Sequence, residues 1–343
     1  MPSLRPPQPA TPPPDAFPVR RGRVADDMTL AYLREGAGGY PLLLVHGYPE
    51  TKRIFWRNVA PLAAAGFEVI VPDLRGFGDS DLSARDEYDI ALYARDLHAL
   101  VRDVLGHARC GVVAGDLGGP VACDLAHRFP GFVERLILFN TVVPVVPEAA
   151  AWYAERGLSL AQLVDGPSSD YRVRQGRDWR VLLAELDTPA RRRRYVRDMY
   201  EHRLWASPGA FDEADIDFMT EPFASAERLA ASWAAYQLAY GRPMSEPPLL
   251  AQPVTAPTLV LYGPDDHVLP ADFPKRCEIA FPNRLGPLVV PECGHFVQWE
   301  RADVLNGLAE LWFAESRQRA PAAGEVVHWT GAPRGGRVEE AGR

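Results

Sequence analysis

The stretch VVAGDLGGP, residues 112–120, places an acidic side chain where a nucleophile could stand. Its apolar start is typical of the end of a buried strand, its glycines indicate a tight turn, and the following VACDLAHRF indicates a helix. A bend of this G-x-S-x-G type exposes its central residue, which here is Asp116 instead of serine. A carboxylate there is suited to attack on a saturated carbon, which forms an ester that must then be hydrolysed. The competing interpretation is a helix N-cap.

Two further candidates follow predicted strands later in the chain. His295 comes directly after GPLVVPECG, and the neighbouring Asp265 and Asp266 come after APTLVLYGP. A lone histidine is more often a core or surface residue, but the order nucleophile, acid, histidine at successive strand ends favours a catalytic arrangement. In such an arrangement the histidine is the general base and the acid orients its ring.

Short apolar runs that alternate with helical stretches must position these side chains. The runs are PLLLVHG, FEVIVPD, RCGVVAGD, ERLILFNTVV, APTLVLYGPDD and GPLVVPECGH, and residues 20–40 predict two more short strands. This alternation predicts an α/β fold with a mostly parallel central sheet flanked by helices. Ligands bind such sheets at the carboxyl ends of the strands.

The chain divides into a core and three other segments on these patterns. Residues 19–143 and 254–318 are predicted to form the core, and residues 144–253, which lack a clear strand run, to form a helical lid inserted after the sixth strand. The Pro-rich residues 1–18 are expected to be a disordered arm, and residues 319–343 a flexible tail.

Composition narrows the classes of partner. The 343 residues carry a net charge of -8, which argues against a nucleic-acid or anionic-membrane partner, and the basic run 191–194 is interpreted as a solvated helix face. No apolar run reaches the about 18 residues of a membrane helix. The four cysteines show no metal-ligand spacing, and no secretory signal is recognised. We therefore expect a cytoplasmic protein without metal or cofactor; its assembly is left open, with a homodimer as the candidate.

The motifs HGYPET, PDLRGFGDSD, AGDLGG, GPDD and CGHFVQWE together resemble the α/β-hydrolase superfamily, over residues 20–315. More narrowly, they resemble its epoxide hydrolase-like branch, in which the elbow residue is aspartate. The resemblance implies a hydrolase that opens an epoxide to a vicinal diol through a covalent ester on Asp116. His295 would activate the water, and the family spacing after Gly263 selects Asp266 over Asp265 as its partner.

The resemblance also implies an oxyanion hole and two proton-donating lid tyrosines. The backbone N–H groups of Tyr48 and Leu117 would form the hole, and His46 would shape the turn beside it. Tyr236, thirty residues before Asp266, matches the second tyrosine, although Gln237 follows it where the family usually has arginine. The first tyrosine is assigned to Tyr171, with Tyr153 and Tyr195 as competitors.

Other functions stay open at this stage. A haloalkane or haloacetate dehalogenase uses the same aspartate nucleophile, but such enzymes usually place tryptophan or arginine near the elbow, where this chain has Leu117 and glycines. A different hydrolase, or a non-catalytic binding protein with the same fold, is a further alternative. Aromatic residues of the predicted lid, among them Trp152 and Tyr153, are interpreted as binding a small apolar substrate.

Overall fold

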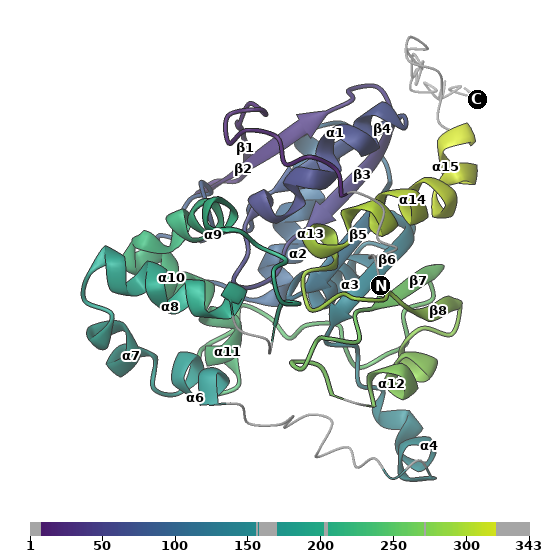
Figure 1. The fold of residues 1–343 in the computed structure, drawn as a ribbon. Coiled ribbons are helices and arrows are strands. Elements are labelled where there is room, and N and C mark those ends of the chain that lie inside the picture. The colour runs from purple at the N-terminus through teal and green to yellow at the C-terminus, as the bar shows by residue number, and fades with distance from the viewer. Residues whose placement is uncertain (1–7, 156, 158–169, 202–204, 271, 320–343) are drawn as a thin grey trace, which may run out of the picture.

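A central sheet organises the chain. The computed structural model describes residues 8–155, 157, 170–201, 205–270 and 272–319. Its eight strands lie in the order β1-β2-β4-β3-β5-β6-β7-β8 (Figure 1). The strands are β1 (Arg20–Ala25), β2 (Met28–Glu35), β3 (Tyr40–Val45), β4 (Phe67–Pro72), β5 (Cys110–Asp116), β6 (Val133–Thr141), β7 (Thr258–Tyr262) and β8 (Arg284–Val289).

Most of the sheet is parallel, as the sequence predicts. Strands β4, β3, β5, β6, β7 and β8 pair in parallel, whereas β2 is antiparallel to β1 and to β4. The register pairs Val45 with Ala114 and Ala114 with Leu138, so β3, β5 and β6 end at one edge. Their central side chains are buried because helices cover both faces of a parallel sheet. The predicted fold class is confirmed.

The connections explain how both faces are covered. Helix α1 (Trp56–Ala64) leads from β3 to its neighbour β4, and α2 (Ile90–Ala99) leads back across β3 to β5. Right-handed crossovers in opposite directions place these helices on opposite faces. Helix α14 (Ala302–Trp312) packs beside α1, and α3 (Gly118–Arg128) packs beside α2 (Figure 1). Three other helices of the core are α12 (Phe273–Ala280), α13 (Val297–Glu300) and α15 (Ala314–Arg319).

The segment between β6 and β7, here called the insertion, forms helices and no strand in its described part. They are α4 (Ala150–Glu155), α6 (Asp170–Gly176), α7 (Trp179–Glu185), α8 (Pro189–Glu201), α9 (Glu213–Thr220), α10 (Ala226–Ser232) and α11 (Ala234–Leu238), with 3₁₀ turns at Pro147–Ala149 and Glu221–Ala224. Helices α6 to α11 gather on one side of the molecule, whereas α4 lies apart from them (Figure 1). No helix of the described residues is long and apolar enough to cross a bilayer.

The N-terminal arm differs from its expected disorder where it is described. The Phe17 ring meets the Trp56 ring edge-on at 5.0 Å, and Trp56 Nε1 donates to the Pro13 carbonyl over 3.1 Å. Gln8 Nε2 donates to Asp303 Oδ1 over 2.7 Å. Proline restricts the unfolded chain, so ordering this segment costs less entropy than its composition suggests. Residues 1–7 and 320–343 of the predicted arm and tail lie outside the described residues, and Arg319 ends α15.

Three of the four arginines in the basic run on α8 form ion pairs with nearby acidic side chains. Arg191 pairs with Asp187 at 3.2 Å, Arg193 with Asp217 at 2.9 Å and Arg194 with Asp198 at 3.0 Å. Arg192 differs from the predicted solvated face: it is buried, and its guanidinium donates to two backbone carbonyls. The run is therefore part of the insertion's own packing.

Candidate active site

The bend that carries Asp116 joins β5 to α3. Asp116 has a φ of 44°, in the left-handed region that few residues other than glycine adopt. Two glycines permit the close approach of the chain around it: a Cβ on Gly47 would collide with the Asp116 side chain, and one on Gly118 with the Val45 carbonyl. Thr141 Oγ1 donates to the Asp116 carbonyl over 2.5 Å. The carboxylate is thereby held at the carboxyl edge of the sheet.

The three side chains predicted to act together do meet. His295 Nδ1 lies 2.8 Å from Asp266 Oδ2, and His295 Nε2 lies 3.3 Å from Asp116 Oδ2. Asp266 Oδ1 accepts the Val268 N–H over 2.7 Å. Asp265 instead accepts from Ser207 Oγ over 3.0 Å. Of the two adjacent carboxylates, the structure therefore brings Asp266 to the histidine.

Two carboxylates flank one buried imidazole. Burial opposes a charge on His295, but Asp266 and Asp116 outweigh it and raise the pKa of His295 well above its ordinary value. Burial likewise opposes ionisation of Asp116, yet His295 and two backbone N–H groups lower the pKa of this carboxyl. Asp116 is thus an ionised carboxylate at neutral pH. It keeps 17% of its side-chain surface exposed, against 1% for His295.

The predicted oxyanion-hole donors both face the carboxylate of Asp116. The Tyr48 N–H donates to Asp116 Oδ1 over 2.7 Å, and the Leu117 N–H also bonds to this carboxylate. One carboxylate oxygen is held by a backbone donor, while Oδ2 faces His295. An ester formed through Oδ2 would leave its carbonyl oxygen among N–H groups, where negative charge is stabilised.

The loop after β3 presents the Tyr48 N–H. Its Tyr48–Pro49 peptide bond is cis. Buried Glu50 accepts from the Gly47 N–H over 2.6 Å and from Gln298 Nε2 over 2.8 Å. Burial and the nearby charge of Asp116 raise the pKa of Glu50 to about 7. A second acidic group with a pKa near neutral pH therefore lies next to the site.

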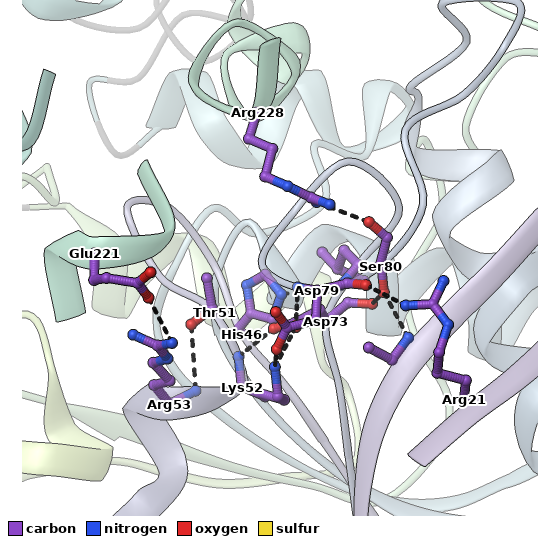
Figure 2. A network of polar contacts seen from close by, with 12 residues as sticks. Arg21, His46, Thr51, Lys52, Arg53, Asp73, Asp79, Ser80, Glu221 and Arg228 are labelled. Atoms are coloured by element: carbon purple, nitrogen blue, oxygen red, sulfur yellow. Dashed lines mark hydrogen bonds and ion pairs between the residues drawn. The ribbon is translucent and has the colours of Figure 1, made fainter. Parts of the chain in front are cut away.

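A buried polar network fixes the next turn of this loop, as Figure 2 shows. Lys52 Nζ lies 2.6 Å from Asp73 Oδ2 and 2.5 Å from Asp79 Oδ2. His46 accepts the Leu74 N–H at Nε2 over 3.0 Å, and its Nδ1 lies 2.9 Å from the Gly47 carbonyl. Burial lowers the pKa of His46, and both ring nitrogens are occupied by the backbone. His46 therefore shapes the turn.

Two arginines join this network to the insertion. Arg53, on the core, pairs with Glu221 at 2.7 Å and donates to the Phe218 carbonyl over 2.6 Å. Arg228, on α10, donates to the Ser80 carbonyl over 2.8 Å (Figure 2). The loop that carries Tyr48 is thus tied to the helices that face it.

Aromatic rings continue from the loop to the histidine. The Tyr48 ring meets Tyr236 edge-on at 5.5 Å, and Tyr236 meets Tyr171 at 5.9 Å. Trp205 then lies 5.1 Å from Tyr171 and 5.0 Å from the ring of His295. The chain of rings begins and ends at residues that touch Asp116, and the charge of Asp116 acts on both predicted tyrosines. Burial raises the pKa of each tyrosine; the charge of Asp116 adds to this rise, and Arg172 offsets part of it.

Sequence reasoning missed that two residues of the insertion bond to the Tyr48 hydroxyl. The Tyr48 hydroxyl accepts from Gln175 Nε2 over 2.7 Å and from Trp233 Nε1 over 3.0 Å. The same Gln175 nitrogen reaches the Tyr195 hydroxyl over 3.0 Å, so Tyr195 joins this second layer. Gln175 follows Tyr171 by four residues and Trp233 precedes Tyr236 by three, spacings that share a helix face. That signal could have identified both.

Trp152 and Tyr153 are not brought to Asp116. They lie on α4, which is separated from α6 and α11 (Figure 1). The Tyr153 ring is buried, and its hydroxyl accepts the Val146 N–H over 3.2 Å. Tyr153 therefore packs its own segment, and the substrate contacts of Trp152 and Tyr153 stay predictions. Among the described residues, no group of three or more histidine, cysteine or acidic side chains could hold a metal ion.

Comparison with known proteins identifies the family of the fold. The family model described as alpha/beta hydrolase fold matches residues 40–302. The chain belongs to the α/β-hydrolase fold family. It is 29% identical over 289 residues to a soluble epoxide hydrolase of Corynebacterium sp. (strain C12), covering 83% of this chain and 94% of the relative.

Other similar proteins include a different activity. A 2-hydroxy-6-oxo-6-phenylhexa-2,4-dienoate hydrolase of Comamonas testosteroni is 28% identical over 301 residues, covering 82% of this chain and 90% of the relative. The solved structure of the epoxide hydrolase CorEH without ligand superposes with a TM-score of 0.69 at 24% identity, covering 88% of this chain and 100% of that one. The chain is therefore an enzyme of the α/β-hydrolase fold with epoxide hydrolases among its relatives.

Proposed function

We propose that the protein hydrolyses small epoxides to vicinal diols through a covalent ester on Asp116. The observation that carries the proposal is the placement of the two Asp116 carboxylate oxygens: Oδ1 accepts the Tyr48 N–H, and Oδ2 faces His295. A serine-type hydrolase needs its N–H donors for the substrate's carbonyl. Here the donors already hold the enzyme's own carboxylate, which becomes the carbonyl of the ester.

The first step is attack of Asp116 on an epoxide carbon. The new bond joins a carboxylate oxygen to that carbon, and the carbon–oxygen bond of the ring breaks. The released ring oxygen needs a proton. Tyr171 and Tyr236, whose rings are in contact and on which the charge of Asp116 acts, supply hydroxyl donors on the insertion, which acts as the lid.

The second step is hydrolysis of the ester. Esterification removes the negative charge of Asp116, so one of the two charges that raise the pKa of His295 disappears. The neutral imidazole then takes a proton from water, while Asp266 orients the ring and stabilises its charged form. The N–H groups of Tyr48 and Leu117 stabilise the oxyanion that forms on the ester carbonyl.

The test is a side-by-side assay with styrene oxide and a short haloalkane. We expect diol from the epoxide and no halide from the haloalkane, because Leu117 follows the nucleophile and the Trp233 N–H is already bonded to Tyr48. Halide release without diol would instead assign a dehalogenase. A single enzyme-limited turnover in ¹⁸O water should place the label in Asp116; label found only in the diol would exclude the ester.

A further inference from the structure

One cation stands directly beside the proposed proton donors, and nothing in the two-step scheme uses it. Arg172 follows Tyr171 on α6, and its Nε–H donates to the Tyr171 hydroxyl oxygen over 3.0 Å. Its guanidinium carbon lies 5.7 Å from the centre of the same ring. Arg172 is half-buried, and no described carboxylate pairs with it. A half-buried guanidinium that bonds to a hydroxyl and, within the described residues, to no carboxylate indicates that its charge serves another group.

The direction of this hydrogen bond determines where the tyrosine proton can go. Because Arg172 donates, the Tyr171 oxygen is the acceptor, and the hydroxyl proton is left to point elsewhere. The charged or titratable groups that face Tyr171 are Arg172 on its own helix, Asp116, His295 and three tyrosines, Tyr48, Tyr195 and Tyr236. Arg172 is thus a cation bonded directly to the oxygen that would become a phenolate.

Tyr236 has no equivalent support. Its ring packs against Tyr48 and Tyr171, but within the described part of the chain no arginine or lysine bonds to its hydroxyl. Burial raises the pKa of both tyrosines, and Arg172 offsets the rise most directly at Tyr171, to which it is hydrogen-bonded. The two hydroxyls are therefore unequal acids at one site.

We infer that Arg172 is a positioning residue that orients the Tyr171 hydroxyl and stabilises its phenolate, so that Tyr171 gives up its proton and Tyr236 only donates a hydrogen bond. The inference rests on the proposed epoxide hydrolysis. In the first step the ring carbon–oxygen bond breaks as the bond to Asp116 forms, and the proton of Tyr171 moves to the ring oxygen. Hydrolysis then yields the diol and a carboxylic acid at Asp116, whose proton balances the one that Tyr171 regains.

The test is a double-mutant cycle on the rate of ester formation in a single turnover, read as the added substrate mass on the Asp116 peptide. We expect Arg172→Met to slow ester formation about 10- to 100-fold, the range for a hydrogen bond to a charged group. In a Tyr171→Phe background the same substitution should have little further effect. In a Tyr236→Phe background it should keep its full effect. Arg174→Met, which removes a cation from the same helix, is the matched control.

A second readout separates this role from a structural one. The acid must be protonated, so ester formation falls at high pH as Tyr171 ionises. Removing the guanidinium raises the pKa of Tyr171, and this alkaline limb should move to higher pH in Arg172→Met. Arg172→Lys keeps the charge and should recover part of the rate; if Arg172→Met does not fold, Arg172→Gln, which also removes the charge, replaces it in the cycle.

Equal effects of Arg172→Met with and without Tyr171 would overturn the inference, as would an unmoved alkaline limb. The proposed function fails separately, because an absence of diol and of any Asp116 adduct in the unsubstituted protein concerns the reaction itself. Normal diol formation with an additive cycle would leave the function standing and remove Arg172 from it.

Discussion

The core half and the insertion half of the site are held by different kinds of contact. Asp116, Asp266 and His295 stand at strand ends, where sheet register, backbone N–H groups and buried charges fix them. Tyr171 and Tyr236 stand on helices of seven and five residues, which are too short to be stable alone. Ring contacts and, for Tyr171, the hydrogen bond from Arg172 hold these tyrosines instead. The sheet therefore positions the charged nucleophile, whereas the packing of side chains positions the proton donors.

The largest effect on the core half of the site is expected when the nucleophile is removed. Asp116→Ala should lower turnover by about 10⁴-fold or more, because no other carboxylate oxygen is placed between the N–H donors and His295. Diol formation measured by chromatography checks this. Asp265→Asn, next to the orienting acid, is the matched control and should keep its activity; activity retained in Asp116→Ala would contradict the assignment.

Removing the base should separate the two steps. His295→Gln is expected to slow ester hydrolysis about 10²- to 10⁴-fold while ester formation continues, so the adduct accumulates on the Asp116 peptide. In the unsubstituted protein, hydrolysis needs neutral His295, so its rate should rise with pH through the pKa of this residue in the ester. Mass spectrometry of quenched samples measures both. A variant that accumulates no adduct would exclude this order of events.

The insertion half should affect the other step. Tyr236→Phe is expected to slow ester formation about tenfold and to leave hydrolysis unchanged, because the lost hydroxyl bonds only to the ring oxygen. Tyr195→Phe is the control, since its hydroxyl lies in the second layer beside Gln175. Single-turnover rates on the two variants sharpen the comparison, and an equal loss in both steps would mean that Tyr236 acts through packing.

The smallest effect concerns the contacts between the halves. Arg53→Met should lower the free energy of unfolding by about 1 kcal/mol, because it removes an ion pair, a carbonyl contact and a cation placed 4.6 Å from the Phe218 ring centre. Arg194→Met removes an exposed pair and should change it by less than about 0.5 kcal/mol. Urea unfolding measures both. Equal values would show that the insertion is held without this contact.

The same contrast explains what the sequence could and could not predict. Strand ends are marked by apolar runs, and chain order places acid and histidine at one edge, so Asp116, His295 and an acid at 265 or 266 follow from local patterns. The choice of Asp266 and the assignment of Tyr236 came from the resemblance to the epoxide hydrolase-like branch. Expectations about location and assembly stay predictions.

The rest depends on tertiary contacts that leave no period in the sequence. Trp152 looked like a lid aromatic, yet α4, which carries it, lies apart from the other helices of the insertion (Figure 1). Trp205 reaches His295 from a segment without helical periodicity, and Arg172 is one arginine among many until its partner is known. Phe17 anchors residues that composition alone assigned to disorder.

Tyr48 takes part in both halves, and this limits how the enzyme can be rebuilt. Its amide holds the carboxylate while its hydroxyl receives Gln175 and Trp233 from the insertion. A chimera that exchanges residues 144–253 for another protein's helices must therefore supply two donors at that hydroxyl, whatever pocket it brings. A chimera that lacks these two donors would gain a new pocket, but its Tyr48 amide would hold the Asp116 carboxylate less firmly.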